Sequence, residues 1–338
     1  MHLQDFDYHL PEGAIAQQPC VPRDQCKMLV LHRGIHHRIF SDLVDYLQDG
    51  DVLVINDTRV RHARLHAHKD TGGKLELLVL DNSDGFYTCL VRGKVRRGTV
   101  FYLDADPAVQ GTVLAKNGGQ CRVELPLSME EVEQRGEMPL PPYIREEVDR
   151  ETAQMYQTTY AREAGSVAAP TAGLHFTPRL LETLRGRGVV IAPLTLHVGM
   201  GTFMPIRSPR IEEHQMEPEY YQISEDTARA LNQAVQQGRR VIAVGTTTVK
   251  ALESAAGRGL VTAGQGWSNL FIYPGYRFRS PLTGILTNFH LPRSTPLLLT
   301  CAFAGREPIL RAYGEALDRG YRFLSFGDAM LILEGGRV

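Results

Sequence analysis

The chain has 338 residues, of which 43% are hydrophobic, and it carries a formal net charge of −1 at pH 7. This length and composition are sufficient for a large buried core and predict two domains, while the near-neutral charge excludes the globally basic character of many nucleic-acid-binding proteins. The five cysteines are scattered and include no Cys-x-x-Cys pair, which argues against a disulfide framework or a zinc site and favours a reduced, cytoplasmic protein.

The first 62 residues are predicted to belong to an α/β domain. The opening segment MHLQDFDYHLPEG lacks the basic start and the apolar run of a secretion signal, so we expect none. The segment DVLVINDTRV is typical of a buried strand that runs into a polar loop. No apolar stretch is long enough to span a bilayer, and we therefore expect no membrane association.

Residues 63–149 show a different pattern, with short strands, turn signals and little helix. This pattern predicts a small antiparallel β-barrel or sandwich that is inserted into the α/β domain. From Arg59 to Arg97 there are nine Lys and Arg against four Asp and Glu, a local excess of positive charge that would suit RNA phosphates. A solvated surface would show the same excess, so both interpretations stay open. We predict no metal site.

Residues 150–338 return to alternating strands and helices. SEDTARALNQAVQQG predicts a helix with Ser224 as its N-cap, and the strand RRVIAVG precedes a second helix over TTTVKALESAAGRG. Another helix is predicted for REPILRAYGEALDRG, followed by a turn and a strand in YRFLSFGDAMLIL. Strands that are apolar on both faces and alternate with helices indicate a mixed, largely parallel sheet. The predicted fold is α/β, with residues 1–62 and 150–338 in one domain and residues 63–149 in the other.

Polar residues follow several of these strands. In VIAVGTTTVKALES, a buried strand and a glycine lead to Thr246 and Thr247 at a helix start, where free backbone N–H groups suit a carboxylate, a phosphate or a ribose. As an alternative, the threonines only cap the helix. Gly199 and Gly201 in HVGMGTF either let the backbone turn or let a ligand lie against it.

Three histidines lie where predicted strands end or helices begin: His175, His197 and His290. In PTAGLHFTP, Thr177 and Pro178 have the pattern of an N-cap and a first helical residue, whereas Thr171 and His175 have no such local role. Because a parallel sheet gathers its carboxyl ends at one edge, these positions predict an active-site cleft. Further polar residues at predicted strand ends or first turns are Asp57, Arg59, Glu253 and Asp328.

Many stretches, in order, resemble the S-adenosylmethionine:tRNA ribosyltransferase-isomerase family of queuosine biosynthesis. They include DFDYHLPEGAIAQQP, VLVINDTRV, MPLPPYI, GSVAAPTAGLHFT, LHVGMGTF, VIAVGTTTVKALES and LTNFHLPRST, and the resemblance runs nearly end to end. It implies an α/β domain with an inserted β-barrel. It also implies transfer and isomerisation of the ribosyl part of S-adenosylmethionine onto 7-aminomethyl-7-deazaguanine at the tRNA wobble position, which yields epoxyqueuosine-tRNA, adenine and methionine.

On this interpretation, His175 is expected to transfer protons, with His197 and His290 as further candidates. No metal or redox cofactor is needed, S-adenosylmethionine is a co-substrate, and we expect a monomer. The expected substrate-binding residues are Asp57, Arg59, Thr171, Gly199, Gly201, Thr246, Thr247, Glu253 and Asp328. The cations expected to contact phosphates of the tRNA are Lys94, Arg96, Arg97, Arg145 and Arg150.

The sequence departs from the family pattern at a few positions. Met204 stands where an arginine usually follows GTF, and Glu217 replaces the second histidine of His-x-Met-His. Thr248 and Lys250 replace a serine and an arginine, which keeps a hydroxyl and a charge. Losing a planar, bidentate cation at position 204 bears on substrate affinity. Two alternatives are an S-adenosylmethionine-dependent RNA methyltransferase and a non-catalytic RNA-binding relative.

Overall fold

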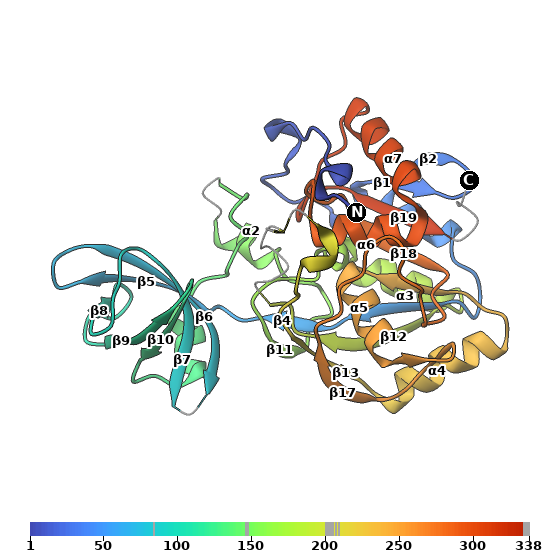
Figure 1. Cartoon of the computed structure of the whole chain (residues 1–338). Helices are drawn as coiled ribbons and strands as arrows, with labels where there is room; N and C mark the ends of the chain where they lie inside the picture. Colours follow the sequence, from blue (N-terminus) through green and yellow to red (C-terminus); the bar gives the residue numbers. More distant parts are fainter. Residues whose placement is uncertain (84, 146–148, 200–205, 207, 209, 334–338) are drawn as a thin grey trace. The chain divides into compact units, whose positions relative to one another are not determined.

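The chain divides into two compact units (Figure 1) in a computed structural model that describes residues 1–83, 85–145, 149–199, 206, 208 and 210–333. The α/β unit comprises Met1–Arg59 and Pro141–Val338, and the barrel unit comprises Val60–Leu140. The sequence placed the second boundary after residue 149. It falls after Leu140 because the returning segment packs on the α/β unit, where Tyr143 Oη lies 2.7 Å from Ser325 Oγ.

A nine-stranded mixed sheet forms the centre of the α/β unit, as the sequence predicted. Its four central strands, β12, β3, β14 and β18, are parallel, and the strands outside them include antiparallel neighbours. In order across the sheet, the strands are β17 (Gly264–Ser268), β13 (Glu219–Ile223), β12 (Val190–Leu196), β3 (Val52–Asn56), β14 (Val241–Val244), β18 (Gly284–Asn288), β19 (Ala329–Leu333), β1 (Lys27–Leu31) and β2 (Ile35–Ile39).

Apolar side chains cover both faces of this sheet. Along β3, Val52 and Val54 join one hydrophobic cluster while Leu53 and Ile55 join another, because successive residues of a strand point to opposite faces. The first cluster includes residues of α4 (Glu225–Gln236), α5 (Thr246–Ala255), α6 (Thr295–Ala304) and α7 (Arg306–Asp318), and the second includes residues of α3 (Pro178–Gly186). None of the described helices is both long and apolar enough to cross a bilayer.

Local sequence signals account for several helix starts. The Ser224 side chain accepts a hydrogen bond from Thr227 N at the start of α4. Thr177 accepts one from Leu180 N at the start of α3, with Pro178 at the first turn, as predicted. Short 3-10 helices occur at η1 (Leu3–Phe6), η2 (Glu12–Ala14), η3 (Arg23–Gln25), η4 (Phe40–Asp45), η5 (Thr171–His175) and η7 (Ile211–Glu213).

The barrel unit is a closed antiparallel barrel. Along β6, buried and partly exposed residues alternate, so that one face fills the interior. Gly111 leaves room for the Phe101 ring there, because a Cβ at this position would lie 2.3 Å from the ring. The strands, in order around the barrel, are β10 (Gln120–Glu124), β7 (Phe86–Arg92), β6 (Lys74–Ser83), β5 (Arg64–Lys69), β8 (Val100–Leu103) and β9 (Gln110–Asn117). The remaining elements are α1 (Met129–Arg135), α2 (Arg150–Gln154), β4 (Thr58–Val60), β11 (Glu163–Ser166), β15 (Ala256–Gly257) and β16 (Leu260–Val261).

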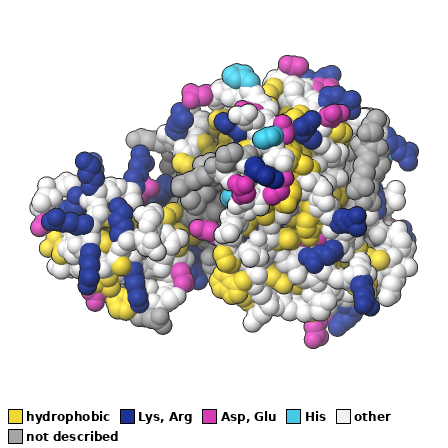
Figure 2. Space-filling view, in the orientation of Figure 1, with side chains coloured by type: hydrophobic (Ala, Val, Ile, Leu, Met, Phe, Trp, Pro, Cys, Tyr) yellow, Lys and Arg dark blue, Asp and Glu magenta, His cyan; other side chains and the backbone are white. Residues whose placement is uncertain are grey.

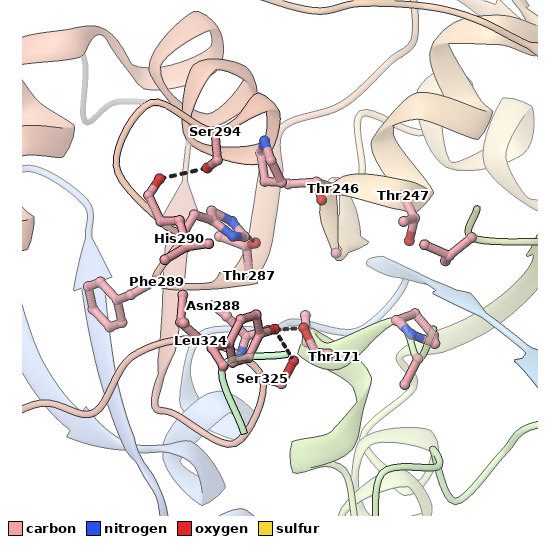
Figure 3. Close-up of a pocket in the computed structure, with 18 residues that line it drawn as sticks. Thr171, Thr246, Thr247, Thr287, Asn288, Phe289, His290, Ser294, Leu324 and Ser325 are labelled. Atoms are coloured by element: carbon pink, nitrogen blue, oxygen red, sulfur yellow. Dashed lines mark hydrogen bonds between the residues drawn. The ribbon is translucent and has the colours of Figure 1, made fainter. Parts of the chain in front are cut away.

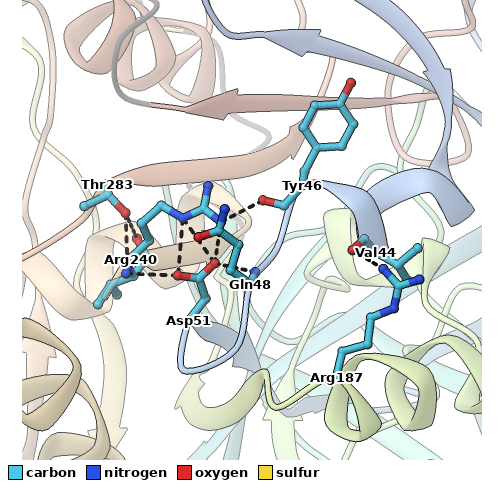
Figure 4. A network of polar contacts seen from close by, with 8 residues as sticks. Val44, Tyr46, Gln48, Asp51, Arg187, Arg240 and Thr283 are labelled. Atoms are coloured by element: carbon cyan, nitrogen blue, oxygen red, sulfur yellow. Dashed lines mark hydrogen bonds and ion pairs between the residues drawn. The ribbon is translucent and has the colours of Figure 1, made fainter. Parts of the chain in front are cut away.

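An ion pair joins the amino ends of β3 and β14 (Figure 4). The carboxylate of Asp51, which is 2% exposed, accepts hydrogen bonds from the guanidinium of Arg240 and from the backbone N–H of Gln48 at 2.7 Å. Arg240 Nη2 also donates to the carbonyl of Tyr46 at 2.8 Å. This network fixes the edge of the sheet opposite to the candidate site.

Candidate functional site

A cavity lies at the carboxyl edge of the central parallel strands (Figure 3). Its empty volume is about 700 Å³, which includes space that is open to solvent. Its walls come from η5, the first turn of α5, the end of β18 with the loop that follows, and the start of α6. We call it the main cavity. Its labelled polar residues in Figure 3 are Thr171, Thr246, Thr247, Thr287, Asn288, His290, Ser294 and Ser325.

The structure describes all three predicted catalytic histidines. His290 lines the main cavity, whereas His175 and His197 do not. The Nε2 atom of His290 lies 2.9 Å from Thr287 Oγ1. Its backbone N–H donates to Tyr313 Oη at 3.1 Å, and its carbonyl accepts a hydrogen bond from Tyr8 Oη. Burial lowers the pKa of His290 to about 3, so the imidazole is neutral at physiological pH. A positioned, neutral imidazole can accept a proton from a ligand.

His175 lies behind the wall of the main cavity. Asn288 Nδ2 donates to His175 Nε2 at 3.2 Å, which leaves the ring proton on Nδ1, 3.1 Å from Cys26 Sγ. Asn288 is itself held by Thr171, whose Oγ1 donates to Asn288 Oδ1 at 2.9 Å. Burial, followed by the charges of Arg322 and Arg23, lowers the pKa of His175 to about 3. Thr171 and Asn288 line the main cavity, whereas His175 contributes to a separate small pocket of about 230 Å³.

The first turn of α5 faces the main cavity. Gly245, at φ +91°, is the N-cap, and no side chain of the described residues caps the helix. The first backbone N–H groups of a helix have no partner within it, and they form its positive end. Thr247 Oγ1 accepts a hydrogen bond from Asn56 Nδ2 at 3.3 Å, whereas Thr248 Oγ1 donates within the helix to Val244 O. Thr246 and Thr247 therefore lie where the sequence predicted a ligand.

Other predicted substrate-binding residues have structural partners outside the main cavity. The carboxylate of Glu253 accepts from the backbone N–H groups of Arg279 and Ser280, at 2.8 and 2.9 Å, and so holds the loop before β18. The carboxylate of Asp328 accepts from the N–H groups of Lys27 and Arg322, at 2.9 and 2.7 Å. The sequence placed both among the polar residues at predicted strand ends or first turns. In the structure, their carboxylates bind backbone N–H groups of other segments.

The residues around β3 and β12 also lie outside the main cavity. His197 Nδ1 lies 2.8 Å from Thr58 Oγ1, and the ring stacks on Tyr220. Asp57 accepts a hydrogen bond from Thr195 at 2.7 Å, and burial raises the pKa of its carboxyl group. Arg59 is half-buried in β4, and Gly199 N–H donates to a glutamate described below. Gly201 and Met204 lie outside the described residues, and Glu217 is exposed.

A second cavity of about 390 Å³ shares three lining residues with the main cavity: Thr246, Thr247 and Pro296. Its wall contains a buried ion pair, in which Lys250 Nζ lies 2.8 Å from Glu219 Oε2. Glu219 Oε1 accepts from the backbone N–H of Gly199 at 2.9 Å. Sequence reasoning assigned no site role to this pair. One feature of the sequence could have drawn attention to Lys250: it is the single charged residue in the first half of the predicted helix that becomes α5.

In the barrel unit, a shallow hollow is lined by the cations Lys69, Lys94 and Arg96, and its lining includes Asp70. Lys69 Nζ donates to the carbonyl of Lys94 at 3.0 Å, whereas the Lys94 and Arg96 side chains are exposed. Figure 2 shows Lys and Arg side chains spread over the face of this unit.

The other predicted RNA contacts have different surroundings. Arg97 is exposed in the same loop but does not line the hollow. Arg145 is exposed in the α/β unit, with Nη1 3.5 Å from Glu12 Oε1. The side chain of Arg150 lies outside the described residues.

Comparisons with known proteins agree with the fold and identify the family. A family model described as "Queuosine biosynthesis protein" matches residues 3–332. Curated proteins named S-adenosylmethionine:tRNA ribosyltransferase-isomerase are similar: that of Heliobacterium modesticaldum is 49% identical and that of Moorella thermoacetica 50%, each over 98% of this chain and 100% of the relative. The crystal structure of the S-adenosylmethionine tRNA ribosyltransferase of Thermotoga maritima matches 97% of this chain and 100% of its own, with 37% identity and a TM-score of 0.57. The chain therefore belongs to the queuosine biosynthesis protein family.

Proposed function

We propose that the protein is an S-adenosylmethionine:tRNA ribosyltransferase-isomerase. It transfers and isomerises the ribosyl part of S-adenosylmethionine onto 7-aminomethyl-7-deazaguanine in the wobble position of tRNA. The observation that carries this proposal is the near-full-length similarity to relatives of that name. It is supported by a cavity at the carboxyl edge of the sheet that has a neutral imidazole in its wall. We also propose that it acts in the cytoplasm as a monomer; its five free cysteines suit a reducing compartment.

The chemistry begins at the carbon next to the sulfonium. The positive sulfur acidifies the hydrogens of C5′, so a base can remove one and form an ylide. The ylide electrons form the C4′–C5′ double bond as the ring oxygen leaves C4′, and the oxygen then forms a carbonyl at C1′ as adenine leaves. The products of this stage are a vinyl sulfonium, an aldehyde and adenine, which takes up a proton.

The tRNA then enters the reaction. The amine of the deazaguanine adds to C4′ and loses a proton to a base, and the electrons of the double bond return to C5′ as a second ylide. This carbanion attacks the C1′ aldehyde and closes a five-membered carbon ring. The alkoxide formed at C1′ displaces methionine from C5′ and so forms the epoxide. The protein has to move protons, orient the sugar and keep water from the reactive intermediates.

The residues of the main cavity fit these tasks. His290 is our candidate for proton transfer because its neutral ring borders the space that the sugar would occupy. Thr246 and Thr247, with the N–H groups of α5 behind them, would bind ribose hydroxyls. His175 acts through Asn288 in this proposal, as a positioning residue whose neutral form holds the Asn288 amide.

The tRNA would contact the protein through exposed cations. Lys94 and Arg96 border the hollow of the barrel unit and are free of carboxylate partners among the described residues. Arg97 and Arg145 are exposed as well. Exposed lysine and arginine side chains suit phosphates because they form charge-assisted hydrogen bonds without losing a buried ion pair.

One assay tests the proposed function. The protein is incubated with labelled S-adenosylmethionine and tRNA that carries the deazaguanine precursor, and the small-molecule products are identified. The proposal predicts adenine and methionine, together with an epoxide-bearing tRNA. Formation of S-adenosylhomocysteine would indicate a methyltransferase instead. Binding of the tRNA without any turnover would indicate a non-catalytic relative.

A further inference from the structure

The ion pair of Lys250 and Glu219 has features that a purely structural contact does not require. Both side chains are nearly inaccessible to solvent, at 7% and 4% exposure, yet both line the second cavity. Burial of two charges carries a desolvation penalty of several kcal/mol per ion, and their mutual attraction offsets it only when further hydrogen bonds are made. Glu219 Oε1 already accepts one from the backbone N–H of Gly199, and a ligand in the cavity would supply the further hydrogen bonds of Lys250.

The ammonium of Lys250 has unused donor capacity. It carries three N–H bonds, and within the described part of the chain it donates one hydrogen bond, to Glu219 Oε2 at 2.8 Å. Two donors thus remain on a buried cation beside an open space. Buried charged groups are usually fully hydrogen-bonded, so this arrangement suits an anionic ligand atom.

The rest of the second cavity is mainly apolar. Leu270, Phe271, Ile272 and Leu299 line it together with Met216. A short aliphatic chain that ends in opposite charges would match this lining, because its methylene groups would contact the apolar side chains. Its charged end would meet the ion pair.

We propose that the second cavity binds the amino-acid end of S-adenosylmethionine while the nucleoside occupies the main cavity. The α-carboxylate accepts hydrogen bonds from Lys250, and the α-ammonium lies against Glu219. The first turn of α5, which borders both cavities, lies beside the ribose. This inference rests on the proposed function and adds the site that distinguishes this co-substrate from other adenosine derivatives.

In this arrangement, the charges of the ligand complement those of the protein: its carboxylate faces Lys250 and its ammonium faces Glu219. A zwitterion brings one negative and one positive group, so the site stays electrically neutral when it is filled. Decarboxylated S-adenosylmethionine keeps the ammonium and leaves the second cavity with an excess positive charge, whereas 5′-methylthioadenosine leaves this cavity unfilled. Both leave Lys250 with unused donors. The site therefore discriminates against 5′-methylthioadenosine and against decarboxylated S-adenosylmethionine.

The first experiment uses the wild-type protein and three ligands. Dissociation constants of S-adenosylmethionine, decarboxylated S-adenosylmethionine and 5′-methylthioadenosine are measured by titration calorimetry. We expect loss of the carboxylate to weaken binding at least about tenfold, the effect of one or two hydrogen bonds to a charged group. Equal affinities for the first two ligands would overturn the inference, and this test does not depend on any variant folding.

The second experiment changes the lysine. Lys250→Met should bind S-adenosylmethionine and its decarboxylated form with nearly equal affinity, whereas Lys250→Arg should keep the preference. Lys27→Met, which removes a lysine from β1 outside both cavities, is the matched control and should also keep it. Thermal unfolding of each variant reports whether it is folded. A Lys250→Met protein that is folded and still prefers the carboxylate would refute the assignment.

Failure of this inference can be distinguished from failure of the proposed function. If the wild-type protein neither binds nor consumes S-adenosylmethionine, the proposed function fails. If it releases adenine from S-adenosylmethionine but shows no carboxylate preference, the function stands and the amino-acid end binds elsewhere.

Discussion

The main cavity and the hollow of the barrel unit present two different kinds of polar surface. The main cavity holds its polar groups in fixed hydrogen bonds, such as Thr171 to Asn288, and keeps His290 neutral. The hollow presents Lys94 and Arg96 to solvent. Fixed, desolvated groups suit the chemistry of one small molecule, whereas mobile, solvated charges suit a polyanion whose attraction salt can screen. Substitutions in the two regions should thus affect different quantities.

The largest expected effect is that of removing the cavity imidazole. His290→Ala should lower the rate of adenine release by about 100- to 10,000-fold, the usual contribution of general acid–base catalysis, while S-adenosylmethionine still binds. Single-turnover kinetics with labelled co-substrate measures this rate. His175→Ala is the matched comparison and should cost less, because its ring does not line the main cavity. A larger loss in His175→Ala would assign the proton transfer to His175.

The next effect concerns acid stability. The unfolded chain protonates a histidine near pH 6.5, whereas the pKa of buried His175 is about 3 in the native state. The unfolded state therefore binds more protons between these values, and acidification should lower the free energy of unfolding by up to about 1.4 kcal/mol per pH unit from this residue. Denaturant unfolding of wild-type protein and His175→Gln between pH 6.5 and 4 measures the difference. Parallel pH profiles for the two proteins would contradict the prediction.

A smaller effect is expected in the barrel unit. Reversing the charges of Lys94 and Arg96 to glutamate should weaken tRNA binding about tenfold or more and reduce the salt dependence of the affinity, while binding of S-adenosylmethionine stays unchanged. Filter binding at several salt concentrations measures both quantities. Lys116→Glu changes an exposed lysine on β9 outside the hollow and serves as the control. An unaltered salt slope in the double variant would rule out phosphate contacts there.

The smallest effect is expected from Thr171→Val. This change keeps the size of the side chain but removes the hydrogen bond to Asn288 Oδ1, which positions the amide that holds His175. A neutral hydrogen bond contributes about 1 kcal/mol, so we expect a roughly fivefold decrease in kcat with little change in KM for tRNA. Steady-state kinetics separates the two parameters. An unchanged kcat would show that this chain of hydrogen bonds does not orient the site.

The sequence was sufficient to predict the elements and their class because the signals are local. The N-caps Ser224 and Thr177, the buried strand β3 and the mixed sheet all follow from spacing and residue type. The position of Thr246 at a helix start beside the cavity also follows, since a glycine and threonines after a buried strand are typical of such a turn.

The roles of the buried charged residues could not be predicted in the same way. Glu253 binds backbone groups 26 and 27 residues away, and Asp328 binds the backbone of Lys27 at the start of the neighbouring strand β1, about 300 residues earlier in the chain. His175 does not line the main cavity, and its ring is held by Cys26 and Asn288 from distant segments. Such partners depend on tertiary packing, about which a single sequence carries little information.

The pairing of Asp51 with Arg240 has a practical consequence for anyone who wishes to alter this protein. The pair joins β3 and β14 at their amino ends, whereas the main cavity lies at the carboxyl edge of the sheet. Substitutions that strengthen or weaken this ion pair are expected to change the melting temperature and to leave the turnover rate at moderate temperature unchanged. Thermal stability and catalytic activity can therefore be altered separately in this fold.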